Sequence, residues 1–188
     1  MDNLKMIKRL RNAGMYFAQG MTAAQLDRAE AVFGFRFPRE IREFLSLAVP
    51  VEKGFFDYRD VSEENQKKFQ EFQNWMEDQF RFDLAECRDI LLELLAEPLG
   101  NPGDFDGAVM DYFHSSVKLI PFYIHRCFFD GMDDMPIVSF MQPVDSIFYA
   151  SSFRDYLEVE FLRKDHDAED PPRERKKETG IWQYLVTP

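Results

Sequence analysis

The sequence predicts a single α+β domain, with a mainly antiparallel sheet flanked by several helices. One stretch, residues 117–161, passes from short apolar runs to helical spacing, the pattern of a strand meander closed by a helix. Helix start and stop signals recur through the N-terminal half. Of the 188 residues, 45% are hydrophobic and 20 are Phe, and a chain of this length buries roughly 70% of its unfolded surface. The core therefore needs no disulfide or metal to support it.

Three runs rich in branched and aromatic residues, 117–123, 136–141 and 146–149, predict the strands of this sheet. A loop is expected between the first two runs and a turn between the second and third. Ser151 and Ser152 can cap the helix that follows. The apolar face of that helix is formed by residues at helical spacing, namely Phe153, Tyr156, Leu157 and Phe161.

The N-terminal part opens with two predicted helices. The first takes its apolar positions from residues 4–17 and is expected to end at Gly20. Thr22 begins the second helix, and Gln25 three positions later completes a capping-box spacing. Gly34 ends this helix, because glycine adopts a left-handed conformation at little cost.

Three further helices are expected before residue 100. Pro38 suits a first helical turn, where its missing N–H does no harm. The helix after it has the apolar positions Ile41, Phe44, Leu45 and Ala48. Ser62 can cap a long helix, and the spacing of Asp83 and Glu86 predicts a second capping box before a helix that Pro98 stops.

Two segments differ in composition from the rest of the chain. Residues 101–107 (NPGDFDG) predict a loop, and residues 164–178 carry dense mixed charge with two prolines, which favours a solvated segment. The apolar residues 180–188 predict an edge strand or a docked tail. We therefore expect one domain over residues 1–163, with a charged linker and an apolar tail over 164–188 that packs back on it.

The charge balance narrows the classes of partner. The net charge is −11 and the isoelectric point is about 4.8. This disfavours nucleic acid and anionic membranes, because phosphate binding needs clustered Lys and Arg. It favours attraction to a basic partner, although acidic composition also serves solubility alone.

The location is predicted from what the N-terminus and the cysteines look like. Cys87 and Cys127 match no metal or redox spacing, so they are expected to be free thiols in a reducing compartment. The N-terminus has no apolar core of a signal peptide, and no run approaches the roughly 20 apolar residues of a membrane span. These features predict a cytoplasmic protein without a membrane association.

The motifs predict neither an enzyme nor a cofactor or metal site. The sequence has no nucleophile motif, Gly-rich phosphate loop, HExxH or EF-hand spacing. His125 is expected to be a structural residue at the end of a strand. On a strand it would point to the same face as Cys127, but the sequence shows no third group to orient such a pair for catalysis.

Short elements in the C-terminal half follow one another in a distinctive order: Leu119-Ile120-Pro121, Tyr123, His125-Arg126, Pro136-Ile137-Val138-Ser139, Gln142, Ile147-Phe148-Tyr149, Asp155-Tyr156-Leu157 and Glu160-Phe161. Others come earlier: Leu26, Glu30, Phe37-Pro38, Phe44-Leu45 and Phe56-Asp57-Tyr58-Arg59. Together they resemble the SUKH superfamily, which contains fungal cell-wall-assembly regulators of the Smi/Knr type and bacterial immunity proteins. Residues 60–115 depart from that pattern, because Trp75 is not part of the family's Trp-Gly pair.

The candidate binding residues come from these elements and from the acidic loops. They are Asp57, Tyr58, Arg59, Asp60, Tyr123, His125, Arg126, Asp130, Asp133, Asp134, Gln142 and Tyr149. The carboxylates are either solvated turn residues or a negative face that speeds encounter with a basic protein. The tyrosines are candidate anchors for a partner if they are exposed.

The resemblance implies a protein-binding function. The leading hypothesis is an immunity protein that neutralises a cognate toxin domain of a polymorphic toxin system by covering its active site. Two alternatives stay open: a regulatory or scaffold protein like the fungal relatives, and a small-molecule sensor with a pocket lined by Tyr123, His125 and Gln142.

Overall fold

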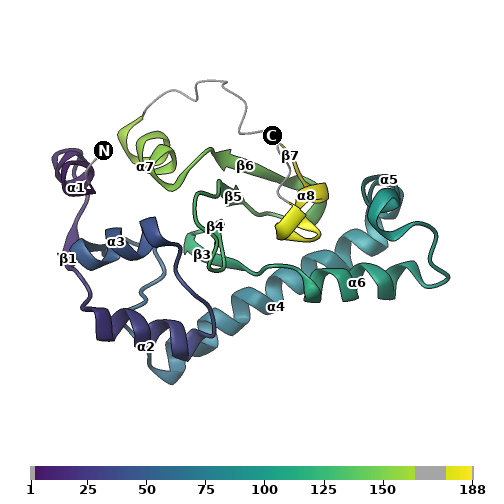
Figure 1. Ribbon diagram of the computed structural model, residues 1–188, viewed down its shortest axis with the longest axis horizontal. Coiled ribbons are helices and arrows are strands. Elements are labelled where there is room, and N and C mark those ends of the chain that lie inside the picture. Colours follow the sequence, from purple (N-terminus) through teal and green to yellow (C-terminus); the bar gives the residue numbers. More distant parts are fainter. Residues whose placement is uncertain (1–2, 164–176, 188) are drawn as a thin grey trace.

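The computed structural model describes residues 3–163 and 177–187, and these form eight α-helices around one main sheet (Figure 1). This confirms the predicted α+β class with helices flanking a mainly antiparallel sheet. The helices are α1 (Asn3–Asn12), α2 (Ala23–Phe33), α3 (Arg39–Leu47), α4 (Glu63–Glu86), α5 (Arg88–Leu99), α6 (Phe105–Ser115), α7 (Phe153–Leu162) and α8 (Trp182–Leu185), with 3₁₀ turns η1 (Pro143–Asp145) and η2 (Lys177–Thr179).

The main sheet has the strand order β3-β4-β5-β6-β7. The first four strands are antiparallel neighbours, and β7 runs parallel to β6. Their bounds are β3 (Leu119–Tyr123), β4 (Arg126–Phe129), β5 (Ile137–Ser139), β6 (Ser146–Ala150) and β7 (Val186–Thr187). The three predicted strands are present, but β4 lies where a loop was expected. It is only four residues long, and the turn before it contains none of the Gly, Asn or Pro residues that signal a hairpin.

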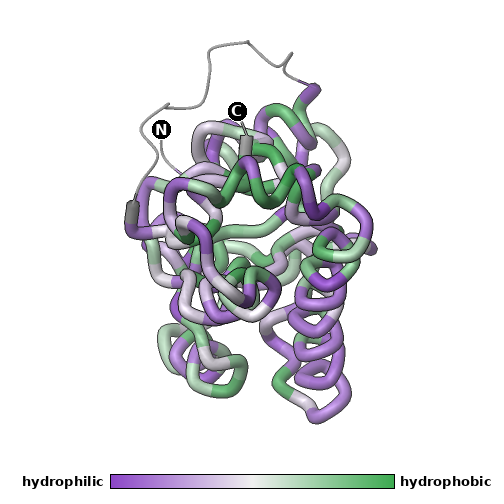
Figure 2. The backbone as a smooth tube through the Cα atoms, turned by 90° about the vertical axis from the view of Figure 1, so that its right-hand side faces the viewer, coloured by the Kyte–Doolittle hydropathy of each residue, from purple (hydrophilic) through white to green (hydrophobic). Residues whose placement is uncertain are grey.

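Alternation of side chains across the sheet creates two separate cores. Ile120 and Phe122 face one core, which α1, α2, α3 and α7 cover. Leu119, Cys127 and Phe129 face the other core, which α5, α6, α8 and most of α4 cover. Figure 1 shows these two groups of helices on opposite sides of the sheet, and most helices in Figure 2 carry both hydrophilic and hydrophobic segments, as amphipathic helices should.

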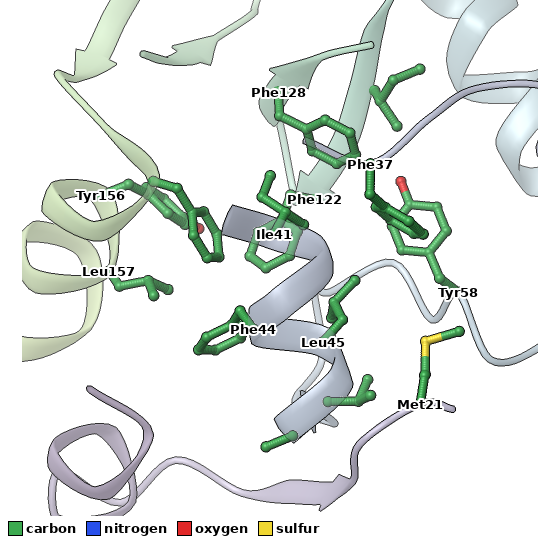
Figure 3. Close-up of a cluster of buried hydrophobic side chains, with 14 of the residues drawn as sticks. Met21, Phe37, Ile41, Phe44, Leu45, Tyr58, Phe122, Phe128, Tyr156 and Leu157 are labelled. Atoms are coloured by element: carbon green, nitrogen blue, oxygen red, sulfur yellow. The ribbon is translucent and has the colours of Figure 1, made fainter. Parts of the chain in front are cut away.

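Helix α3 lies at the centre of the first core (Figure 3). Ile41, Phe44 and Leu45 are buried, as their spacing predicts. The Phe44 ring meets the edge of Phe17 at 6.1 Å and of Phe153 at 5.3 Å, which joins the N-terminal segment to α7.

The N-terminal helix is shorter than predicted. It ends at Asn12, and Gly14 turns the chain with a φ of +100°. A strand follows, β1 (Phe17–Gln19), and it pairs with β2 (Ala48–Pro50) in a small two-stranded sheet. The prediction of one helix from Leu4 to Phe17 is therefore wrong in its C-terminal part. The apolar residues of the helix and of the strand happen to share a helical spacing in the sequence.

The two predicted signals around α2 are confirmed. Thr22 Oγ1 accepts from the Gln25 N–H at 3.3 Å, and Gln25 Oε1 accepts from the Thr22 N–H at 2.8 Å. Gly34 ends the helix with a φ of +71°. These bonds satisfy N–H groups that a helix start otherwise leaves without partners.

Two predictions for residues 83–107 are wrong. Asp83 does not cap a helix, because it is buried inside α4 and accepts a hydrogen bond from the Val144 N–H at 2.9 Å. The expected loop at residues 101–107 contains the start of α6, since Asp104 caps that helix by accepting from the Gly107 N–H at 3.0 Å. An Asp near a helix end can cap it, lie in a turn or accept from a distant N–H, and the sequence pattern does not distinguish these roles.

The C-terminal segment packs on the sheet. Trp182 is buried and donates from Nε1 to the Val117 carbonyl at 2.6 Å, and the Ile181 N–H donates to Ser116 Oγ at 2.8 Å. The edge strand predicted for residues 180–188 is limited to β7, because residues 182–185 form the helix α8. Of the predicted charged segment, residues 164–176 lie outside the described residues.

Strand β3 is an edge strand, and the segment 54–58 closes its outer side. The Phe56 N–H donates to the Phe122 carbonyl at 3.1 Å, and the buried Tyr58 hydroxyl donates to the Pro121 carbonyl. The missing N–H of Pro121 costs nothing here, since it would point outward, away from β4.

Within the described residues, none of the helices combines the length and apolar character required to cross a bilayer.

Replacing Tyr58 with Phe should lower the free energy of unfolding by about 1–3 kcal/mol. The ring contacts remain, but the buried Pro121 carbonyl loses its donor. Urea denaturation measures the change, with Tyr16→Phe as the control because that side chain is 73% exposed. Equal stability of the two variants would contradict this role for the hydroxyl.

Candidate functional site

The β3–β4 hairpin contains three of the candidate binding residues, Tyr123, His125 and Arg126. Tyr123 pairs with Arg126 across a two-residue turn, Ile124–His125. Ile124 has a left-handed φ of +52° and is 58% exposed. A β-branched side chain rarely adopts this conformation, which costs about 1–2 kcal/mol in an L-residue. The turn is held by the Ile124 N–H, which donates to the Gly54 carbonyl at 2.8 Å.

Gly54 is required beside this turn. Its φ is +110°, and a Cβ added there would lie 2.8 Å from Cε2 of the Tyr123 ring. The close approach lets Phe55 form an antiparallel bridge with Tyr123, with ring centroids 4.6 Å apart. Glycine therefore permits the 54–58 segment to lie against the hairpin.

Arg126 is the centre of a polar cluster between the sheet and α7. Its Nη1 donates to Ser139 Oγ at 2.7 Å and contacts the His125 ring. Its guanidinium carbon lies 3.7 Å from the Tyr149 ring centroid, a cation–π distance. Its Nε lies 3.5 Å from Glu160 Oε2, an ion pair without hydrogen-bond geometry. The two side chains are only 14% and 20% exposed.

Three tyrosines surround the Glu160 carboxylate. Burial first, and then the negative charge of Glu160, raises the pKa of Tyr123 and, well above its usual range, that of Tyr156. Burial and then a hydrogen bond with Glu160 raise the pKa of Tyr149. The Tyr156 hydroxyl is buried without a hydrogen-bond partner among the described residues. All three phenols therefore stay protonated at neutral pH, and their rings pack between the hairpin and α7.

A hollow of about 420 Å³ adjoins the cluster on the outer side of β3. Its lining includes Tyr123 and Ile124 of the hairpin and Asp57 and Asp60 of the 57–60 segment. The remaining lining residues are Gly54, Phe55, Phe56, Asn65, Lys68, Phe72, Pro121 and Phe122. The structure thus joins two parts of the predicted site, the 57–60 segment and the hairpin, at one surface.

The 57–60 segment is ordered by its own polar groups. Asp57 pairs with Arg59 through two side-chain hydrogen bonds of 2.8 and 2.6 Å. Asp60 Oδ1 accepts from the Ser62 N–H at 2.9 Å, which lowers the pKa of Asp60. Asn65 Nδ2 donates to the carbonyls of Asp57 and Asp60, at 2.9 and 2.7 Å. These hydrogen bonds fix the 57–60 segment where Asp57 and Asp60 line the hollow.

The acidic loop after β4 has a structural role that the sequence did not indicate. Asp130 Oδ1 accepts from the Arg36 N–H at 2.7 Å, and Asp133 Oδ1 accepts from the Arg39 N–H at 2.6 Å. Asp133 thereby caps α3, whose own N-cap residue is a proline without a capping side chain. Asp134, with a φ of +55°, lies 3.7 Å from the Arg39 guanidinium. These three residues fasten the 36–39 segment to the sheet rather than forming an unengaged negative face.

Two other candidates lie apart from the hairpin surface. Tyr58 is buried beneath the hollow, among the rings of Phe33, Phe35, Phe37 and Phe56, so it does not meet the condition for an exposed anchor. Gln142 precedes η1, and its carbonyl accepts from the Ser146 hydroxyl at 2.8 Å. Of the three residues predicted to line a ligand pocket, Tyr123, His125 and Gln142, only Tyr123 lines this hollow.

Sequence reasoning omitted Glu160 and Ser139 as site residues. Glu160 lies four residues after Tyr156 and therefore on the apolar face of α7, and a charge there signals a buried partner. Ser139 pairs with Arg126 in the sheet, but the short β4 concealed that neighbour.

The thiols are not reactive groups. Cys127 is fully buried, and burial raises the pKa of its thiol well above the usual range. Burial also raises the pKa of Cys87, followed by the charges of Asp83 and Glu86. Thiolates are the nucleophilic form, so neither residue is activated. The described residues contain no group of three His, Cys, Asp or Glu side chains placed to hold a metal ion.

No protein-family model, curated protein or solved structure matches this chain. The likeness to the SUKH superfamily therefore stays a prediction from the pattern of residues.

Replacing Glu160 with Gln should lower the free energy of unfolding by about 1–3 kcal/mol, because Arg126 then keeps a mostly buried charge without its counter-ion. Denaturant unfolding measures this, with Glu71→Gln in the exposed Lys67–Glu71 pair as the control. The double variant with Arg126→Met should lose less stability than the sum of the two single changes. A loss no larger than that of the control would contradict the pairing.

His125 should make the protein less stable in acid. Burial first, and then the Arg126 charge, lowers its folded pKa below the ordinary 6.5, so the unfolded chain takes up a proton first as pH falls. The unfolding free energy lost between pH 7 and pH 5 should therefore be smaller in His125→Gln than in the parent protein. Between pH 7.5 and 8.5 the difference between the two proteins should stay constant, because His125 is neutral in both states. A difference that does not change below pH 7 would contradict this.

Proposed function

We propose that this chain is a protein-binding module that neutralises a cognate toxin domain in the cytoplasm of the producing bacterial cell. The proposal follows the resemblance to SUKH immunity proteins. The observation that carries it is Ile124, an exposed β-branched residue held in a left-handed turn. Strained backbone conformations often mark functional sites, and the exposed Ile124 side chain at this strained turn is available to another surface.

The surroundings of Ile124 favour a protein partner over a substrate. The neighbouring Tyr123 and Arg126 are residue types that dominate binding energy at interfaces. Glu160 and Tyr149 hold Arg126 in place, and the rings of Phe55 and Phe161 hold Tyr123. The net charge of −11 favours rapid encounter with a basic protein. Occlusion of the toxin's active site needs a rigid surface and no reactive group on this chain.

A second candidate function is small-molecule sensing, which the hollow beside Tyr123 favours by its size of about 420 Å³. A rise in melting temperature on adding a metabolite would support it. The scaffold function of the fungal proteins has no specific observation in its favour.

The test is co-expression of this chain with the toxin domain encoded beside it. We expect rescue of growth and a complex at micromolar concentration whose association slows with added salt. Ile124→Asp should abolish rescue. The control is Leu92→Asp, since Leu92 is an apolar residue of α5 that is 41% exposed, and it should leave rescue unchanged.

A second measurement separates binding from folding. Ile124→Asn should raise the unfolding free energy by about 1 kcal/mol, because Asn tolerates the left-handed conformation, and yet it should weaken the complex. No complex with the parent protein would overturn the proposed function. A complex that Ile124→Asp leaves intact would remove the hairpin from it.

A further inference from the structure

The hollow beside β3 has walls suited to a flat cation. Its lining includes the partly exposed aromatic residues Phe55, Phe56, Phe72 and Tyr123, together with the charged residues Asp57, Asp60 and Lys68. Aromatic faces carry negative charge density, so they attract a guanidinium or ammonium group placed over them. An apolar ligand alone would make no use of the carboxylates in this lining.

The charged residues that line the hollow, together with their ion-pair partners, carry a net charge of one negative unit. Asp57 is balanced by Arg59, to which it is doubly hydrogen-bonded. Lys68 lines the hollow, and its Nζ lies 2.7 Å from Glu64 Oε1, so these two charges also offset one another. The carboxylate of Asp60 remains as the net charge. It accepts from the Ser62 N–H, and Asn65 donates to the main-chain carbonyl of Asp60.

From these observations we propose that the hollow receives an arginine side chain presented by a basic protein partner. A guanidinium stacks on aromatic rings and pairs with a carboxylate at the same time, which a compact ammonium does less well. Ile124, at the wall of the hollow, would contact the partner's backbone beside that arginine. That the partner is a protein rests on the proposed function, whereas binding of the cation depends on this chain alone.

The test is an NMR titration of the full chain with N-acetyl-arginine N-methylamide and with the neutral citrulline analogue. The arginine probe should shift the backbone amides that surround the hollow, including those of Gly54, Asn65 and Ile124. The citrulline probe should bind about tenfold more weakly, because it lacks both the ion pair and the cation–π contact.

Matched variants locate the charge. Asp60→Asn keeps the oxygen that accepts from Ser62 and should weaken binding of the arginine probe about two- to fivefold. Asp111→Asn makes the same change of net charge on an exposed part of α6 and should have no effect. Equal shifts with both probes, or shifts spread over the acidic surface that Asp60→Asn does not change, would overturn the inference.

The two proposals can fail separately. Capture of the arginine probe without any toxin complex would leave this inference standing and overturn the proposed function. A toxin complex with an affinity that Asp60→Asn leaves unchanged would overturn the inference alone.

Discussion

The closure of the β3 edge is the constraint on which the surface of this protein depends. An edge strand exposes backbone groups that would otherwise pair with another chain. Here the segment 54–58 occupies that edge, and the Tyr58 hydroxyl satisfies the Pro121 carbonyl from within the core. The hollow, the position of Phe55 and the hydrogen bond that holds Ile124 all follow from this docking.

The central sheet divides the interior into two cores, and polar side chains tie the layers together. On the first face, Arg126 and Glu160 join the sheet to α7. On the second face, Asp83 joins α4 to η1 through the Val144 N–H. Burial raises the pKa of Asp83, so keeping this carboxylate in the interior costs free energy. In return, its hydrogen bond specifies one arrangement of α4 and η1. Each of these groups fixes how two elements sit relative to one another.

The acidic residues illustrate how one composition serves two purposes. Asp130 and Asp133 look like surface charges in the sequence, but the structure uses them as acceptors for backbone N–H groups at the start of α3. Asp57 and Asp60 are also held by local hydrogen bonds, but they line a hollow together with aromatic residues. The net charge therefore says little about where a partner binds, whereas the geometry of the hairpin and the hollow says more.

The sequence by itself determined the α+β class, three strands of the sheet and the helices capped by Thr22, Ser62 and Ser152, because caps and periodicity depend on neighbours within a few residues. Part of the candidate site could also be predicted. Asp57 and Asp60, and Tyr123, His125 and Arg126 around Ile124, belong to short sequence elements that can be recognised without a structure. Only the tertiary structure decided the rest. The Tyr58 donor and its acceptor are 63 residues apart, and Asp130 and the Arg36 N–H are 94 apart. Such pairings, and the left-handed turn at Ile124, arise when distant segments compete for the same unsatisfied backbone groups, and no local pattern records that competition.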